Sequence, residues 1–441
     1  MKKFLFLTAT AVAVFASCAK TIDHTRNTGQ GDAVSFGVYI PKTITKGGIG
    51  GELTTTTLQT KGFGVFAYYT GANAYDVAGQ GDAINFMYNQ KVSGASWTYT
   101  PVKYWPNMTN GDSDTPASSD DNAPMLSFLA YAPYAQVTPS TGVSNPATGE
   151  TANDVGITAV SKNTDTGDAL VTYTVPNAFD PLTSVDLTYA VGKDITYTDV
   201  AGNSVAITDG DPVLNLTKPD ATNPTKIKFL FKHALALLDV QTQLSVDQTT
   251  LGGTFNTAET KVTVEEIKIT IPGQYNSGKL NLRTGVWDFT GASSANKVIT
   301  ISGDNINAAI KDDNTKTFDD QPDGVVAASL TPAFVQTPAP GAITILPKTG
   351  SATTLTVEIT YYVITKDGNL DAGESRIKNH ITKDVEFPTT AFNQGTKNIL
   401  KIGLGLTSVK LEAEVANWED GEEKTVFLPI NSKSLFLFRR A

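Results

Sequence analysis

The stretch that decides the fold runs from residue 355 to residue 363 and reads Leu-Thr-Val-Glu-Ile-Thr-Tyr-Tyr-Val. Apolar side chains at the odd positions alternate with mostly polar ones at the even positions, which is the period of a strand with one buried face. The same alternation recurs at 400–406 and at 409–415, whereas helical periodicity is nearly absent. Repeated strands separated by turns predict an all-β chain built from antiparallel sandwiches.

Other segments extend this pattern into the first half of the chain. Residues 33–40 alternate strictly, and residues 63–69 carry aromatic side chains on both faces, which predicts a strand covered on both sides. Two adjacent glutamates, Glu265 and Glu266, interrupt an alternating run and predict a β-bulge. The apolar run at 231–238 is ambiguous between strand and helix.

Composition narrows the class of protein. Of the 441 residues 40% are hydrophobic, enough for sizeable cores, and only 18% are charged. Threonine, serine, asparagine and glycine take the place of charged residues, as is typical of an exported β-rich surface protein. The net charge is −10, and loss of Lys2 and Lys3 with a leader would make it −12, so we expect no nucleic-acid partner.

The amino terminus predicts export and lipidation. Lys2 and Lys3 precede an apolar run at 4–16, which is too short to span a bilayer, and Cys18 follows at once. This ending resembles the lipobox of bacterial lipoproteins, in which the cysteine is acylated and becomes the first residue. The residue after it is alanine, not aspartate, which favours the outer membrane. The alternative is an ordinary signal peptide with a chance cysteine.

The body of the chain offers little chemistry. Cys18 is the only cysteine, so a lipidated chain has no thiol left for disulfides, zinc or nucleophilic catalysis. The three histidines lie outside any metal-ligand spacing, and neither a GxSxG nor an HExxH motif occurs. The segment 367–371 departs from a calcium loop at its glycine and glutamate positions and predicts a hairpin turn. We predict neither an enzyme nor a cofactor or metal site.

Several segments, in order, resemble the fimbrillin family, the lipoprotein-precursor subunits of type V pili in Gram-negative anaerobes. They are the strand Val34 to Ile40, the loop Thr45-Lys46, the strand Gly62 to Tyr68, the aromatic segment Trp97 to Pro106, Ser127 to Pro133, Asp186 to Ala190, Phe231 to Leu235, Gly278 to Leu280 with Gly285 to Trp287, and Val415 to Trp418. The order and spacing of these segments cover most of the chain.

The resemblance implies two transthyretin-like β-sandwich domains in tandem and assembly by strand exchange. In the family a trypsin-like protease cuts the loop after the first strand, and another subunit fills the groove that is left. Here the cut is expected after Lys46, in a glycine-rich loop. Arg26 precedes the strand and Lys61 abuts the next one, so both are weaker candidates. The expected released strand is marked by Val34, Phe36, Val38 and Ile40, and the expected donor strand by Val426, Leu428 and Ile430.

These expectations divide the chain into five parts. They are a lipoprotein signal peptide at 1–17, a lipidated propeptide with the removable strand at 18–46, an N-terminal sandwich at 47–215, a C-terminal sandwich at 216–424 and a donor tail at 425–441. The boundary near 215 rests on the polar segment 198–225, which contains three prolines. The alternative for the tail is that residues 425–430 form the last strand of the second domain and donate no strand to another subunit.

Three functions therefore compete. The first is a fimbrial subunit at the outer-membrane surface that polymerises with other subunits and mediates adhesion. The second is a surface lipoprotein that never polymerises and binds glycans or host ligands, for which the aromatic residues around 97–105 are candidates. The third is a secreted hydrolase, which the motif search disfavours.

Overall fold

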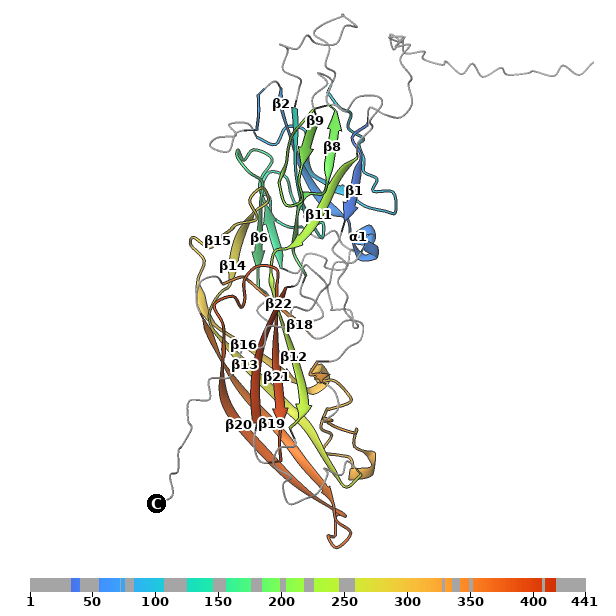
Figure 1. Ribbon diagram of the computed structural model, residues 1–441, viewed down its shortest axis with the longest axis vertical. Coiled ribbons are helices and arrows are strands. Elements are labelled where there is room, and N and C mark those ends of the chain that lie inside the picture. The colour runs from blue at the N-terminus through green and yellow to red at the C-terminus, as the bar shows by residue number, and fades with distance from the viewer. Residues whose placement is uncertain are drawn as a thin grey trace, which may run out of the picture.

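The computed structural model describes residues 33–39, 55–71, 73–75, 83–106, 125–145, 156–175, 185–198, 204–217, 226–245, 258–326, 330–334, 342–348, 352–406 and 409–417. Strands dominate, and two groups of sheets follow one another along the long axis of the molecule (Figure 1). The elements of the first half are β1 (Phe36–Tyr39), α1 (Thr55–Lys61), β2 (Phe63–Gly71), β3 (Met87–Val92), β4 (Met125–Ala132), β5 (Ile157–Val160), β6 (Leu170–Thr174), β7 (Thr188–Gly192), β8 (Ile195–Thr198), β9 (Ser204–Ile207), β10 (Val213–Leu216) and β11 (Ile227–His233).

The second half continues with longer strands. Its elements are β12 (Ala236–Leu244), β13 (Thr260–Tyr275), β14 (Ser277–Asn281), β15 (Trp287–Asp288), β16 (Ser294–Ser302), η1 (Gly303–Asn305), η2 (Phe318–Asp320), β17 (Thr331–Pro332), β18 (Ala342–Ile345), β19 (Thr353–Lys366), β20 (Glu374–Phe387), β21 (Thr396–Leu404) and β22 (Val409–Asn417). Within the described residues no helix is long and apolar enough to cross a membrane.

The first sandwich is built around a sheet with the order β1-β11-β7-β4-β2-β3, to which β10 adds beside β4. One face of this sheet packs on the sheet β15-β14-β6-β5, and the core between them includes Phe66, Leu129 and Tyr173. The other face carries a second core, which α1 and the β8–β9 hairpin cover through Leu58 and Ile195. The prediction that the strand at 63–69 is covered on both faces is confirmed, because β2 is buried over most of its length.

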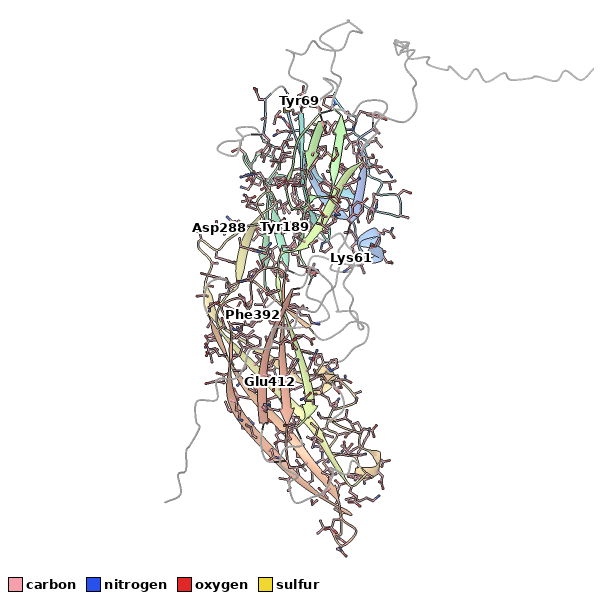
Figure 2. All side chains as sticks on the ribbon, in the orientation of Figure 1. Lys61, Tyr69, Tyr189, Asp288, Phe392 and Glu412 are labelled. Carbon is pink, nitrogen blue, oxygen red and sulfur yellow. The ribbon has the colours of Figure 1, made fainter. Side chains whose placement is uncertain are left out.

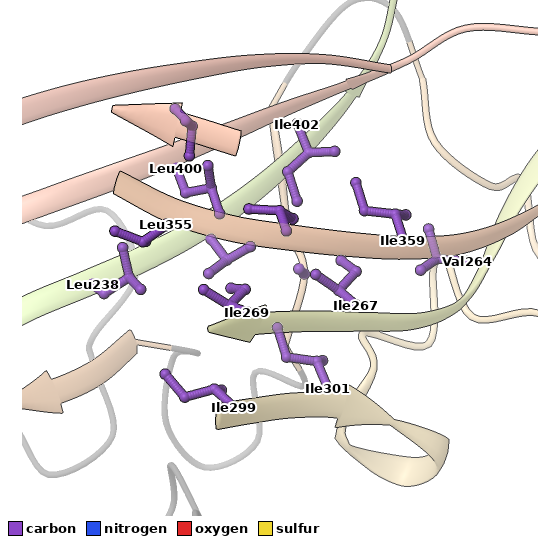
Figure 3. Close-up of a cluster of buried hydrophobic side chains, with 14 of the residues drawn as sticks. Leu238, Val264, Ile267, Ile269, Ile299, Ile301, Leu355, Ile359, Leu400 and Ile402 are labelled. Atoms are coloured by element: carbon purple, nitrogen blue, oxygen red, sulfur yellow. The ribbon is translucent and has the colours of Figure 1, made fainter. Parts of the chain in front are cut away.

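The second sandwich closes over one large aliphatic core. The sheet β17-β12-β21-β22, with β18 beside β12, faces the sheet β16-β13-β19-β20. Side chains of the two sheets meet in Figure 3, which labels Leu238, Leu400 and Ile402 from one sheet and Ile267 and Ile359 from the other. The alternating sequences at 355–363 and 400–404 therefore supply the buried faces that their period predicts. The prediction of an all-β fold with tandem sandwiches is confirmed.

The chain passes from the first sandwich to the second later than we expected. β11 lies after the boundary predicted at 215/216, yet it pairs with β1 and β7 in the first sheet. The crossing occurs at Ala234-Leu235, after which Leu237 packs into the first sandwich's core and Leu238 into the second. β14 and β15 also return to the first sandwich, where β14 pairs with β6. The polar, proline-bearing segment before 226 resembles a linker in composition, but it connects two strands, β10 and β11, of one sheet.

The structure confirms some of the local features predicted from the sequence and differs from others. The bulge at Glu265-Glu266 is confirmed by a register shift between Val264 and Glu266, and residues 367–371 form the turn between β19 and β20. Helix α1 was not predicted, because its threonine-rich sequence resembles that of the preceding loop. Two strand pairs, β1 with β11 and β12 with β21, are parallel within sheets expected to be antiparallel.

The return of β14 to the first sandwich predicts where a second-half mutation acts. Leu280→Ala should lower the free energy of unfolding by about 2–5 kcal/mol, because Leu280 is fully buried among first-half side chains and its truncation leaves a cavity. Denaturant unfolding measures this. The control Val286→Ala, on a side chain that is 63% exposed, should change stability by about 0.5 kcal/mol at most. Equal effects of the two variants would contradict the assignment.

Candidate functional site

The candidate site is the place of β1 in the first sandwich. β1 forms the edge of the seven-stranded sheet and pairs with β11 in parallel, with Phe36 beside Ile227 and Tyr39 beside Leu230. Its side chains alternate as the sequence predicts: Val34 and Phe36 are 2% and 1% exposed, Val38 is partly buried, and Tyr39 is 44% exposed. A short edge strand thus contributes its apolar row to the domain's core.

Backbone contacts hold this segment from both sides. On one side the Ile227 amide donates to the Ser35 carbonyl oxygen at 2.9 Å. On the other side the Val34 amide donates to the Lys103 carbonyl oxygen at 2.9 Å, and the Tyr99 hydroxyl donates to the Val34 carbonyl oxygen at 2.7 Å. The β1 segment therefore lies in a slot between β11 and the aromatic segment around 97–105.

Phe36 lies at the centre of an aromatic cluster. Its ring stacks on Phe229 at a centroid distance of 5.7 Å and meets the edges of Tyr99 at 5.6 Å and of Phe63 and Phe128 at 6.1 Å each. Such aromatic pairs add about 0.5–1.5 kcal/mol each beyond the burial of area. These four neighbours line the site that we call the Phe36 seat.

The Phe36 seat combines apolar ring surface with the backbone edge of β11. Removing β1 would expose this ring surface and leave the outer edge of β11 without backbone partners, and each of these changes is unfavourable in water. The seat therefore requires both an apolar side chain and a strand backbone beside β11.

The predicted site residues fall into two groups. Val34, Phe36 and Val38 lie together in the core, on one face of one segment. The other predicted residues, Cys18, Ile40, Lys46, Val426, Leu428 and Ile430, lie outside the described residues, as does Arg26. Their roles stay predictions.

Lys61 is less accessible than a typical surface lysine, as expected. It is the last residue of α1, on the flank of the first sandwich, and is half-buried (Figure 2). Burial lowers the pKa of its ammonium group below the usual range. The Gly62 amide donates to the Leu58 carbonyl oxygen at 2.7 Å, which ties the backbone after Lys61 to the helix. A protease would have to open this turn to cut there.

No feature of the sequence indicated the part that Tyr99 plays in this site. The aromatic residues at 97–105 were candidates for glycan binding. Tyr99 and Trp105 are buried, so they pack in the core, whereas Tyr104 is 62% exposed. Burial raises the pKa of the Tyr99 phenol, so its hydroxyl stays protonated as a donor. Aromatic density signals a core in the sequence, but no sequence signal indicates which strand this hydroxyl contacts.

Two polar clusters elsewhere serve the fold. The Asp186 carboxylate lies 2.8 Å from Nδ1 of His233, and both side chains are buried, so this histidine is structural as expected. The Asp168 carboxylate accepts hydrogen bonds from Arg283 Nε at 2.8 Å and from the Tyr75 hydroxyl at 2.9 Å. Burial raises the Tyr75 pKa, and the cluster joins the loop before β6 to the loop after β14. Across the described residues no group of three or more side chains could hold a metal ion.

Comparison with known proteins supports the resemblance to fimbrial subunits. No family model matches the chain. Over 396 residues the chain is 26% identical to fimbrium subunit Fim1C of Phocaeicola vulgatus, a match that covers 86% of this chain and 87% of that protein. The chain is thus similar to this fimbrium subunit over most of the length of both proteins. The predicted resemblance to fimbrillins is therefore confirmed, and the prediction that the chain is not an enzyme agrees with the homologue's name.

A solved structure has a fold similar to that of this chain. It is a fimbrial protein from Bacteroides vulgatus that superposes with a TM-score of 0.57 at 22% identity. The superposition covers 88% of this chain and 99% of the other.

Substitution of Phe36 tests whether the seat belongs to the folding core. Phe36→Ala should lower the free energy of unfolding of the first sandwich by about 3–5 kcal/mol, because it removes four ring contacts and leaves a cavity. Tyr39→Ala, on the exposed face of the same strand, should cost far less. Thermal unfolding of both variants distinguishes them, and similar losses would argue against a core role of β1.

Proposed function

We propose that this chain is a structural subunit of a cell-surface fimbria that polymerises by exchange of β1. The observation that carries the proposal is the Phe36 seat, where an edge strand of only four residues supplies the central ring of a domain core. A strand that is both peripheral in the sheet and central in the core is suited to replacement by an equivalent strand. The homologous fimbrium subunit supports a role in a fimbria.

The proposed processing step is a cut in the segment that contains Lys46. Lys46 lies between β1, which ends at Tyr39, and α1, which begins at Thr55. A cut after Lys46 by a trypsin-like protease would sever the only covalent connection between β1 and the rest of the chain. Acylated Cys18 would leave with β1, so the lipid would serve transport to the outer membrane, and the cut subunit would join the fimbria.

The donor of the new strand is proposed to be the carboxyl-terminal tail of another subunit. β22 ends at Asn417, which pairs with Thr396, and the neighbouring Gly395 amide donates to the Leu235 carbonyl oxygen at 2.9 Å. The tail therefore leaves the fold near the crossing between the sandwiches. Within the tail Val426, Leu428 and Ile430 repeat the spacing of Val34, Phe36 and Val38. The partners implied are other fimbrial subunits.

Trypsin treatment of the purified precursor tests processing and polymerisation together. We expect a cut near Lys46, followed by a ladder of oligomers that boiling in detergent dissociates. Lys42 is the other basic residue between β1 and α1, so Lys42→Gln together with Lys46→Gln should abolish both the cut and the ladder. Lys61→Gln should change neither, because Lys61 is half-buried at the end of α1. Electrophoresis with and without boiling measures the ladder.

The same experiment distinguishes the competing function. A cut chain that stays monomeric while it binds glycans would favour the non-polymerising surface lipoprotein. Exposed Tyr104 and Val102 would then be the first residues to replace. Cutting at Lys61 in place of Lys46 would contradict the proposed processing site.

Truncation after Lys424 tests the donor. The shortened chain should be cut normally but should form no ladder, because it keeps a seat and lacks a donor. Both sandwiches should unfold as in the full chain, since the last described strand ends at Asn417. An undiminished ladder would show that the donor lies elsewhere, and a large loss of stability would favour the tail as the last strand of the second sandwich.

A further inference from the structure

The two ends of β1 are held unequally. At the Val34 end both backbone groups are bonded on the side away from β11, and Ala33 forms an antiparallel bridge with Tyr104. At the Tyr39 end the segment pairs with β11 at Leu230, and the Tyr39 side chain is 44% exposed. Among the described residues, β11 is the only backbone partner of Val38 and Tyr39.

The extra contacts at the Val34 end come from residues 97–105, which we call the clasp. The clasp is rooted in the core, because Trp97 packs on Phe63 at a centroid distance of 5.8 Å and Trp105 packs on Phe128 at 6.1 Å. The antiparallel bridge between Ser93 and Thr98 ties the start of the clasp to the residue that follows β3. The clasp is therefore held by contacts with the core and with the backbone beside β3.

Tyr99 connects the clasp to Val34, which precedes β1, and to Phe36 within β1. Its hydroxyl donates to the Val34 carbonyl oxygen and accepts from the Lys103 amide at 3.3 Å, and its ring packs on Phe36 at 5.6 Å. Losing the Val34 end therefore means losing a backbone hydrogen bond and an aromatic contact at the same place. Among the described residues, losing the Tyr39 end costs the backbone pairing with β11 and the contacts of a partly exposed side chain.

We propose that Tyr99 is a latch, and that β1 leaves its slot from the Tyr39 end and is released only when the Tyr99–Val34 bond breaks. The inference rests on the proposed strand exchange and assigns its order. An incoming strand would pair first beside Phe229 and Leu230 and would reach the clasp last. Because the latch bonds a main-chain carbonyl oxygen, it would hold an incoming strand whatever its side chains, while the Phe36 seat selects a large apolar residue.

Exchange kinetics test the latch. The full chain is cut with trypsin and mixed with an excess of isotope-labelled peptide of residues 33–46, and mass spectrometry follows replacement of the bound fragment. Tyr99→Phe should speed replacement about two- to tenfold, the worth of one hydrogen bond. Tyr131→Phe is the matched control, because it removes a buried hydroxyl that bonds Asn89 at 2.9 Å in the other core of the same sandwich. Equal rates for Tyr99→Phe and the wild type would overturn the latch.

Hydrogen exchange in the uncut chain gives a second test that needs no protease. The Val34 amide, which donates to the Lys103 carbonyl oxygen, should exchange more slowly than the amides of residues 37–39. Tyr99→Phe should reduce this difference by loosening the Val34 end, while Tyr131→Phe should preserve it. Uniform exchange along 33–39 in the wild type would overturn the order of release. A wild-type chain that shows the difference but never exchanges its fragment after cutting would contradict the proposed function and leave the latch standing.

Discussion

The contact on which the first sandwich depends is the insertion of Phe36 among Phe63, Tyr99, Phe128 and Phe229. Those neighbours come from β2, β4, β11 and the clasp, so one ring from an edge strand joins three strands and a loop. Burial of a large aromatic side chain is among the stronger single contributions to a core. The sheet therefore cannot lose β1 and remain covered, and a replacement must present a similar side chain at the same position.

The second sandwich differs in this respect. Its core is a continuous aliphatic cluster drawn mainly from long strands, and β19 pairs with the edge strand β20 over fourteen residues each. No comparable short strand carries the centre of that core among the residues the structure describes. The crossing at Ala234-Leu235 connects the two sandwiches, with the Trp287 indole donating to the Ala234 carbonyl oxygen at 2.8 Å. The first sandwich, whose core includes the short strand β1, and the second sandwich are thus joined by a well-packed segment.

Features that depend on local periodicity, such as buried strand faces, could be predicted from the sequence. Features that depend on which strands pair with one another could not. Alternation identified the buried faces correctly at 355–363 and over 34–38, and the two glutamates at 265–266 marked a real bulge. The boundary at 215 failed because polarity and proline content do not distinguish a loop within a sheet from a linker. The parallel pairing of β1 with β11 joins residues about 190 positions apart, which no local pattern encodes. The hydrogen bond of the Tyr99 hydroxyl could not be predicted for the same reason, since its acceptor is the backbone oxygen of Val34, which is distant in sequence.

We propose that β1 occupies the place beside β11 before processing and that a strand of another subunit occupies it afterwards. Electron cryomicroscopy of filaments grown from the cut protein would show which strand lies there. We expect a strand beside β11 whose density fits Val426, Leu428 and Ile430 of the neighbouring subunit, with no connection to residue 47 of its host. Density that fits residues 34–39 in that place, or filaments joined through surfaces remote from β11, would contradict it.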